Sequence, residues 1–224
     1  MTDPPAPLRT HSHAHAHHDG PSMVRRAWTR KEALDALESS ARRETQNPDF
    51  LWERVGLAEG ETVVDVGAGT GFFALPAARR VGGEGHVYAV DLSEELVDLI
   101  RERAEEEHLT QLRVVHNTLT SIPLASGIAD VVLLANVLHD IPPSTVAEAA
   151  RLLKPEGRFV NVDWKKEATP GGPPVEVRLS MEEAIHALGT HGLVDVDRWE
   201  FGPWHYAIRL ERADRAQNAS LRSE

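Results

Sequence analysis

The chain has 224 residues, a hydrophobic content of 41% and no cysteine. This length allows one α/β domain with a substantial core, while the lack of cysteine excludes disulfides, thiolate metal sites and cysteine nucleophiles. The formal net charge of -11 opposes attraction to nucleic-acid phosphates, so no nucleic-acid partner is expected. The chain has no apolar leader and no long apolar run, which predicts a cytoplasmic protein without membrane insertion.

Residues 1–22 are rich in proline and histidine and contain almost no large apolar residue. Such a segment cannot bury enough apolar surface to fold, so we expect a disordered tail. Its histidines are competent metal ligands, but no carboxylate or thiol completes a site, and no metal is assigned. Residues 23–213 are expected to form one folded domain, and residues 214–224 a frayed C-terminal tail.

Two helices are predicted before the first strand. Thr29 is a typical N-cap for a helix that runs to about Thr45, and Asn47-Pro48 breaks it. A short helix, Asp49–Val55, then ends at Gly56. These helices should lie over one rim of the sheet, either as a structural cover or as a lid on a substrate or cofactor.

Short aliphatic strands then alternate with helices, a pattern typical of a Rossmann-like, doubly wound α/β fold. The continuous apolar runs indicate central parallel strands. Five strands are expected, at Thr62–Val66, His86–Asp91, Leu112–His116, Ala129–Ala135 and Arg158–Trp164. Four helices are expected, at about Phe72–Val81, Ser93–Glu107, Ser144–Leu153 and Ser180–His191.

Two last strands, Val194–Phe201 and His205–Glu211, flank Gly202-Pro203-Trp204. This connection is too short for a crossover helix, so the last two strands should be antiparallel to each other.

A glycine-rich turn follows the first strand. Asp65 is followed by Gly67, Gly69 and Gly71, and then by a helix. Glycines let a ligand approach the backbone closely, and the start of a helix offers unpaired N–H groups. A dinucleotide site requires Gly or Ala three residues after the second glycine. Phe72 stands there, which argues against a bound pyrophosphate and a nucleotide-dependent oxidoreductase.

Two acids flank this turn. Asp65 would repel a diphosphate but could accept a hydrogen bond from a ligand's ammonium group. Asp91 ends the second strand, where an acid can bind both hydroxyls of a ribose. S-adenosylmethionine has an ammonium group, a free ribose and no phosphate, and so fits both acids. The alternative is that each acid only caps the helix that follows it.

Four segments together resemble the class I S-adenosylmethionine-dependent methyltransferases: Val63–Gly71, Val90-Asp91, Asn136-Val137-Leu138-His139 and Leu153-Lys154-Pro155-Glu156-Gly157. The resemblance covers roughly residues 50–210 and is greatest to the small stand-alone type related to ubiquinone/menaquinone and arsenite methyltransferases. It implies a seven-stranded sheet of order 3-2-1-4-5-7-6, with strand 7 antiparallel and N-terminal cover helices. Arsenite methylation in the resembling enzymes depends on thiolates, so the absence of cysteine excludes that activity.

The resemblance assigns the glycine turn to the methionine end of the cofactor. It implies that Asp65 lies near the amino group of the methionine portion. Gly67, Ala68, Gly69 and Gly71 would lie against the cofactor.

The same resemblance implies that Asp91 holds the ribose and that Leu92 lies against the adenine. An acid after strand three usually meets the adenine amino group in this family, but Asn117 and Thr118 stand at that place here. Either side-chain oxygen can accept the same hydrogen bond. Asn136, at the end of strand four, would face the methionine portion.

A general base is needed only if the methyl acceptor is protonated at neutral pH. His139 is the candidate, because it follows strand four at the carboxyl edge of the sheet, where ligands bind in open α/β folds. Asp140 is its neighbour, but adjacency in sequence does not make a hydrogen-bonded pair. The alternative is that His139 only caps or packs the next helix. Asp163 ends strand five at the same edge.

Other polar and aromatic residues lie near this edge. Trp164 either lines the acceptor pocket or covers the sheet. Lys165-Lys166 is expected to be a solvated pair rather than an anion site. Arg178 could bind a carboxylate, but a surface ion pair with Glu176 is the simpler expectation. His205 is expected to be structural.

The leading hypothesis is a methyltransferase that acts on a small-molecule acceptor. A non-catalytic S-adenosylmethionine-binding regulatory module is the alternative. The identity of the acceptor and the oligomeric state are not legible in the sequence.

Overall fold

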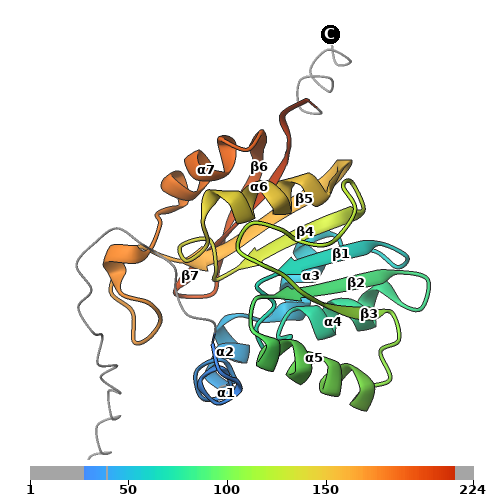
Figure 1. Ribbon diagram of the computed structural model, residues 1–224. Coiled ribbons are helices and arrows are strands. Elements are labelled where there is room, and N and C mark those ends of the chain that lie inside the picture. The colour runs from blue at the N-terminus through green and yellow to red at the C-terminus, as the bar shows by residue number, and fades with distance from the viewer. Residues whose placement is uncertain (1–27, 39, 215–224) are drawn as a thin grey trace, which may run out of the picture.

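A computed structural model describes residues 28–38 and 40–214 (Figure 1). Its centre is one seven-stranded sheet of order β3-β2-β1-β4-β5-β7-β6. Strand β7 is antiparallel to both β5 and β6, while β1 to β5 form only parallel pairs among themselves. The strands are β1 (Thr62–Val66), β2 (His86–Asp91), β3 (Leu112–His116), β4 (Ala129–Ala135), β5 (Leu153–Trp164), β6 (Leu193–Phe201) and β7 (His205–Arg212). The expected strand order and the antiparallel last strand are therefore confirmed.

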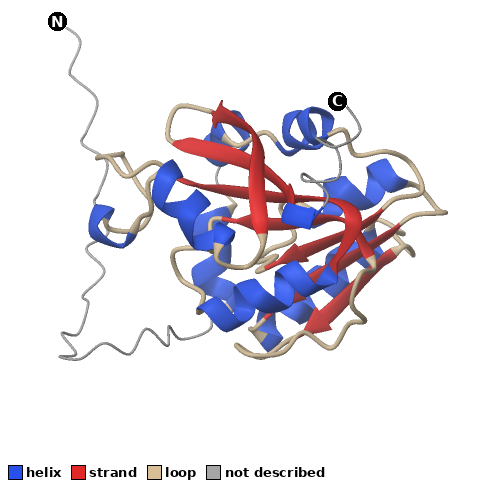
Figure 2. Cartoon of the chain, turned by 90° about the horizontal axis from the view of Figure 1, so that it is seen from above, coloured by secondary structure: helices blue, strands red, loops and turns tan. Residues whose placement is uncertain are grey.

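Helices cover both faces of the sheet (Figures 1 and 2). The helices are α1 (Arg30–Leu37), α2 (Ser40–Thr45), α3 (Pro48–Val55), α4 (Ala74–Val81), α5 (Glu94–Glu106), α6 (Pro143–Leu152) and α7 (Met181–Gly189), with a 3-10 turn at Val175–Val177. One layer is made by α3, α4 and α5, and the other by α6 and α7.

The central strand β4 explains the two layers. Val131 and Leu133 point into the core beneath α3, α4 and α5, while Val132 and Leu134 point to the core beneath α6 and α7. Successive side chains of a strand alternate between faces, so a strand covered on both faces must be apolar throughout. The apolar run therefore marks β4 as a central strand.

The N-terminal helices differ from the prediction. A single helix from Thr29 to about Thr45 was expected, but α1 ends at Leu37 and α2 begins separately. Glu38 is held by Arg103 of α5, whose guanidinium also donates to the carbonyl of Thr70. The break lets α1 pack on α5 while α2 turns toward the glycine turn.

Other boundaries shift slightly. Helix α4 begins at Ala74 rather than Phe72, because Phe72 still belongs to the turn. The expected turn at Lys154–Gly157 lies within β5, where the pairing with β4 shifts register between Ala129 and Val131.

The two tails, residues 1–22 and all but the first residue of 214–224, lie outside the described part of the chain. Within that part no helix is both long and apolar enough to span a membrane.

Gly202 allows α2 to dock on the β6–β7 turn. Its φ is 70°, and a Cβ placed there would lie 1.9 Å from the carbonyl oxygen of Thr45. Gly60 has a similar φ of 80°, but a Cβ placed on it would have no neighbouring atom within 4 Å. Substitutions at both glycines cost backbone strain, but only a substitution at Gly202 also costs a steric collision.

We predict that Gly202→Ala lowers the free energy of unfolding by about 3 kcal/mol or more, because strain and collision add. Gly60→Ala should cost only the backbone strain, about 1 kcal/mol. Urea unfolding of both variants measures the difference. Equal losses would show that the α2 contact contributes nothing to stability.

Candidate functional site

The glycine turn connects β1 to α4 and lies against the end of β2. The N–H groups of Gly67 and Ala68 both donate to the carbonyl of Val90, at 2.8 and 3.0 Å. Gly67 has a φ of 76°, and a Cβ there would lie 2.6 Å from Cγ1 of Val137. The turn thus fits closely between β2 and the loop after β4. Its backbone conformation and the lack of space for a side chain both require glycine at position 67.

Asp65 carries a buried carboxylate at this turn. The residue is 1% exposed, and its Oδ2 has no hydrogen-bond partner among the described residues. Burial and, less strongly, the charge of Asp91 raise the pKa of Asp65 to about 7, against the opposing effect of Arg42. Asp65 does not cap α4, whose N-cap is Phe73 without a side-chain hydrogen bond.

Asp91 is anchored by the backbone. Its Oδ2 accepts from the N–H of Gly69 at 2.8 Å, and its Oδ1 accepts from the N–H of Ser93 at 2.9 Å. Burial raises its pKa, and these backbone donors oppose the rise. Ser93, rather than Asp91, caps α5 through the N–H of Leu96. A carboxylate oxygen has two lone pairs, so each can still accept a ligand hydroxyl.

The residues expected at the adenine lie next to Asp91. The N–H of Asn117 donates to the carbonyl of Asp91, and its side-chain amide donates to the carbonyl of Thr118. Asn117 is buried, whereas Thr118 is exposed and pairs with Ser121. The carbonyl of Leu92 is held by the ring of His116. Asn117 is thus the buried member of the two and Thr118 the exposed one.

Helix α2 brings a cation to the same site, which the sequence did not indicate. The guanidinium of Arg42 lies 4.0 Å from the centre of the Phe72 ring and donates to the carbonyl of Leu37. Burial lowers its pKa to about 10, while the charges of Glu38 and Asp65 act in the opposite direction. Phe72 thus serves as a platform for a cation.

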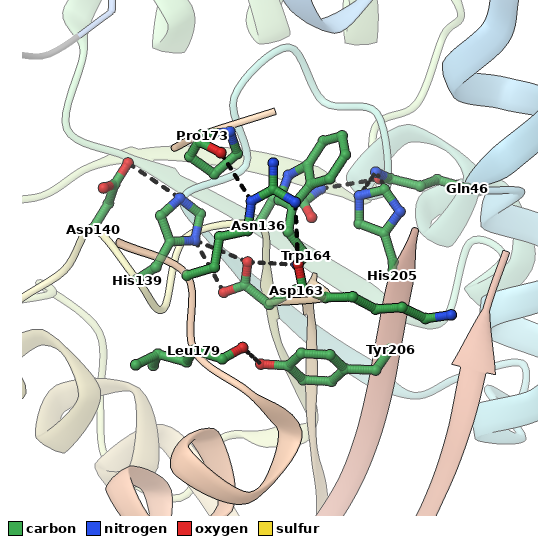
Figure 3. A network of polar contacts seen from close by, with 12 residues as sticks. Gln46, Asn136, His139, Asp140, Asp163, Trp164, Pro173, Leu179, His205 and Tyr206 are labelled. Atoms are coloured by element: carbon green, nitrogen blue, oxygen red, sulfur yellow. Dashed lines mark hydrogen bonds and ion pairs between the residues drawn. The ribbon is translucent and has the colours of Figure 1, made fainter. Parts of the chain in front are cut away.

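A polar network joins α2 to the ends of the strands (Figure 3). The side-chain amide of Asn136, which has a φ of 59°, donates to Oε1 of Gln46 at 3.0 Å. Nε2 of Gln46 bonds to the ring of His205. Burial, and then the charges of Arg42 and other cations, lower the pKa of His205 to about 3. His205 is therefore a neutral, buried hydrogen-bond partner, as its expected structural role requires.

His139 pairs with a carboxylate, but not mainly with its neighbour in sequence. Its Nδ1 lies 2.8 Å from Oδ1 of Asp163, whereas its Nε2 lies 3.6 Å from Oδ2 of Asp140. Figure 3 shows the ring between the two acids. Asp163 comes from the end of β5 and is 1% exposed. The sequence placed His139 and Asp163 at the same edge of the sheet but did not predict that they form a hydrogen bond.

Arg178 is not part of a surface ion pair with Glu176, and that expectation is wrong. The residue is 3% exposed, and its guanidinium lies 5.1 Å from the Trp164 ring. It donates to the backbone carbonyls of Pro173, Lys165, Glu167 and Gly171. Five N–H donors in a planar fork suit a cation to holding several carbonyls. Arg178 therefore folds the Pro/Gly-rich loop onto Trp164.

Lys165 and Lys166 are partly exposed, and each pairs with a carboxylate. Lys165 contacts Glu200, and Lys166 contacts Glu183 at 2.8 Å.

Comparison with known proteins identifies the family. Residues 64–161 match the sequence model of a methyltransferase domain. A crystal structure of a SAM-dependent methyltransferase from Aquifex aeolicus is 30% identical, with a TM-score of 0.76. The alignment covers 80% of this chain and 96% of that one. The chain belongs to the S-adenosylmethionine-dependent methyltransferases. S-adenosylmethionine is the cofactor of that family.

Curated relatives match over a shorter part of the chain. The demethylmenaquinone methyltransferase of Oceanobacillus iheyensis is 25% identical over 146 residues, and that of Listeria welshimeri is 30% identical over 115 residues. The matches cover 64% and 50% of this chain, but only 61% and 49% of the relatives. The chain thus spans about three fifths or less of the curated relatives it matches.

We predict that Asp65→Asn changes the pH dependence of stability in the absence of cofactor. A carboxyl whose pKa is raised in the folded state contributes stability that is present below about pH 4 and lost as the pH rises through about 7. An asparagine side chain keeps the shape of the carboxyl and lacks its charge. The variant should therefore be more stable than the wild type at pH 8, by up to about 4 kcal/mol, and much closer to it at pH 4.

Urea unfolding at pH 4, 6 and 8 measures this difference. Asp98→Asn, at a surface carboxylate of α5, is the matched control and should shift stability little at any of these pH values. A constant difference between Asp65→Asn and the wild type would contradict the raised pKa.

Proposed function

We propose that the chain is an enzyme that binds S-adenosylmethionine at the glycine turn and methylates a small organic acceptor. Family membership supports the activity, and the observation that carries the site assignment is the buried Oδ2 of Asp65. A buried carboxylate oxygen without a partner is costly, and a ligand ammonium group would satisfy it. When bound, the cofactor supplies an electrophilic methyl group on a sulfonium.

The residues of the turn would hold the methionine end of the cofactor. Asp65 would accept hydrogen bonds from the ammonium group, and Gly67, Ala68, Gly69 and Gly71 would allow the close approach that larger side chains forbid.

The residues after β2 and β3 would hold the nucleoside end. Asp91, already oriented by two backbone donors, would accept from the ribose hydroxyls. Leu92 would cover the adenine, and Asn117 or Thr118 would accept from its amino group. The buried Oδ1 of Asn136, which has no hydrogen-bond partner among the described residues, supports a contact with the methionine portion.

Arg42 completes the recognition of an α-amino acid. A methionine end carries both an ammonium and a carboxylate group, and Asp65 can satisfy only the first. The partly buried guanidinium of Arg42 acts on Asp65 electrostatically, and a guanidinium binds a carboxylate in a fork of two hydrogen bonds. Helix α2 would then be a lid on the cofactor, the sharper of the two expected roles for the N-terminal helices.

The acceptor is proposed only as a class. The named relatives act on demethylmenaquinone, and the chain covers only part of their length. A small acceptor would enter at the edge where β4, β5 and β7 meet, beside Trp164. His139 is the proposed general base for an acceptor that must lose a proton.

Binding and transfer can be tested separately. Calorimetry should detect binding of S-adenosylmethionine and S-adenosylhomocysteine but not of NAD, and Asp91→Ala should weaken cofactor binding about 10-fold or more. Asp98→Ala is the charge-matched control. Methyl label from the cofactor should then appear in a low-molecular-weight product of a cell extract, identified by mass spectrometry. Tight NAD binding without affinity for the adenosyl ligands would refute the proposal; binding without transfer would favour a regulatory module.

The role of Arg42 has its own test. Arg42→Gln should weaken binding of S-adenosylmethionine about 10-fold or more, because a charge-assisted contact is lost. Binding of decarboxylated S-adenosylmethionine, which lacks the carboxylate, should change much less. Arg43→Gln, at the exposed neighbour, is the matched control. Equal losses for both ligands would show that Arg42 only supports the fold of α2.

A further inference from the structure

The His139–Asp163 pair is held in a fixed geometry. Nδ1 of His139 lies 2.8 and 3.1 Å from the two carboxylate oxygens of Asp163. Oδ1 of Asp163 also accepts from the N–H of Trp164 at 2.8 Å, which fixes the carboxylate on the end of β5. Both side chains are buried, so neither can turn away into solvent.

This geometry selects one tautomer of the imidazole. An ionised carboxylate can only accept hydrogen bonds, so Nδ1 must carry the proton that it shares with Asp163. Nε2 of the neutral ring then bears a lone pair. The same arrangement, a base oriented by a buried acid, is what general-base catalysis at a hydroxyl requires.

Charged groups surround the pair from several elements. Asp140, in the loop before α6, lies 3.6 Å from Nε2. Arg178 and Tyr206 both interact electrostatically with Asp163. Burial, and then the charge of Asp163, raises the pKa of Tyr206 above its usual value. His205 packs against Trp164, and burial, followed by the charges of Arg42, Arg178 and Lys165, lowers its pKa.

The fixed lone pair of Nε2 bears on the chemistry of the acceptor, because a positioned base serves a group that must give up a proton as it reacts. A thiol loses its proton readily near neutral pH, whereas a phenol-type hydroxyl, with a pKa of about 10, does not. A positioned base is therefore best matched to a hydroxyl.

We propose that Asp163 is the positioning residue for His139 and that the acceptor reacts through a phenolic or enolic hydroxyl. This inference rests on the proposed methyltransferase function. The hydroxyl proton passes to Nε2 of His139, and the oxygen electron pair forms the bond to the methyl carbon. The carbon–sulfur bond breaks with its electron pair on sulfur, which gives S-adenosylhomocysteine. The imidazolium, stabilised by Asp163, returns the proton to solvent.

The first experiment reads the tautomer without catalysis. Nitrogen-15 NMR of histidine-labelled full-length protein, with His139 assigned through His139→Gln, should show the proton on Nδ1 at pH 7.5. Asp140→Asn should keep this tautomer, because the bond to Asp163 remains. Asp163→Asn should disturb it, because an amide can donate to Nδ1. A wild-type ring with its single proton on Nε2, or one protonated on both nitrogens up to pH 9, would overturn the inference.

The second experiment tests the acceptor class with defined probes. The probes are 1,4-dihydroxynaphthalene and catechol for hydroxyls, benzylamine for amines and benzyl mercaptan for thiols. Methylation of a hydroxyl oxygen, located by mass spectrometry and NMR, is the expected result. Transfer only to the amine or the thiol, or to none of the probes while S-adenosylhomocysteine binds, would overturn the acceptor class. Failure of both adenosyl ligands to bind would instead refute the proposed function.

The third experiment separates positioning from folding. The substrate is the hydroxyl probe that the wild type methylates. With it, Asp163→Asn should lower kcat about 100-fold or more, while the calorimetric Kd for S-adenosylmethionine stays within about two-fold. The acid limb of its kcat profile should move to lower pH, because the imidazolium loses a neighbouring carboxylate. Asp163→Glu, which keeps the charge, should recover part of kcat. An unmoved pH profile would assign Asp163 a structural role only, and the wild-type tautomer decides the question even if Asp163→Asn does not fold.

Discussion

Parallel strands whose carboxyl ends meet at one edge impose the constraint on which this site depends. Asp65 and Asp91 come from adjacent strands and lie on either side of the glycine turn, both largely shielded from water. Burial raises the pKa of Asp65 to about 7. That arrangement is unfavourable in an empty site and becomes favourable when a cationic group is supplied. The local instability and the proposed cofactor recognition therefore have one physical cause.

Helix α2 contacts the carboxyl ends of the strands as well as covering the sheet. Gln46 connects Asn136, at the end of β4, to His205, at the start of β7. The carbonyl of Thr45 fits against Gly202 so closely that a larger residue there would collide with it. Arg42 is carried on the same short helix. Any movement of α2 would therefore change the cation near Asp65 and the network near Trp164 together.

The acceptor side has a different electrostatic character from the cofactor side. The glycine turn carries Asp65, whose Oδ2 has no hydrogen-bond partner among the described residues, whereas the edge of β4, β5 and β7 places Asp140 and Asp163 on either side of His139 and a cation against Trp164. In the proposed reaction the first side would hold the sulfonium ligand and the second would supply the proton-accepting histidine. The fold brings the two halves together because β1 and β4 are neighbours in the sheet.

The sequence by itself determined the positions of the strands, the antiparallel hairpin and the two acids around the glycine turn. These features depend on local signals: apolar runs, glycine spacing and a connection too short for a helix. The order of the strands in the sheet was expected only from the resemblance to a known family. Only the tertiary structure decided that His139 pairs with Asp163, that Arg178 is buried against Trp164, and that α2 brings Arg42 and Gln46 to the site. His139 and Asp163 are 24 residues apart, and Gln46 and His205 are 159 apart. Periodicity indicates which edge or face a residue occupies, but the partner it meets depends on how distant elements pack, and no local pattern encodes that choice.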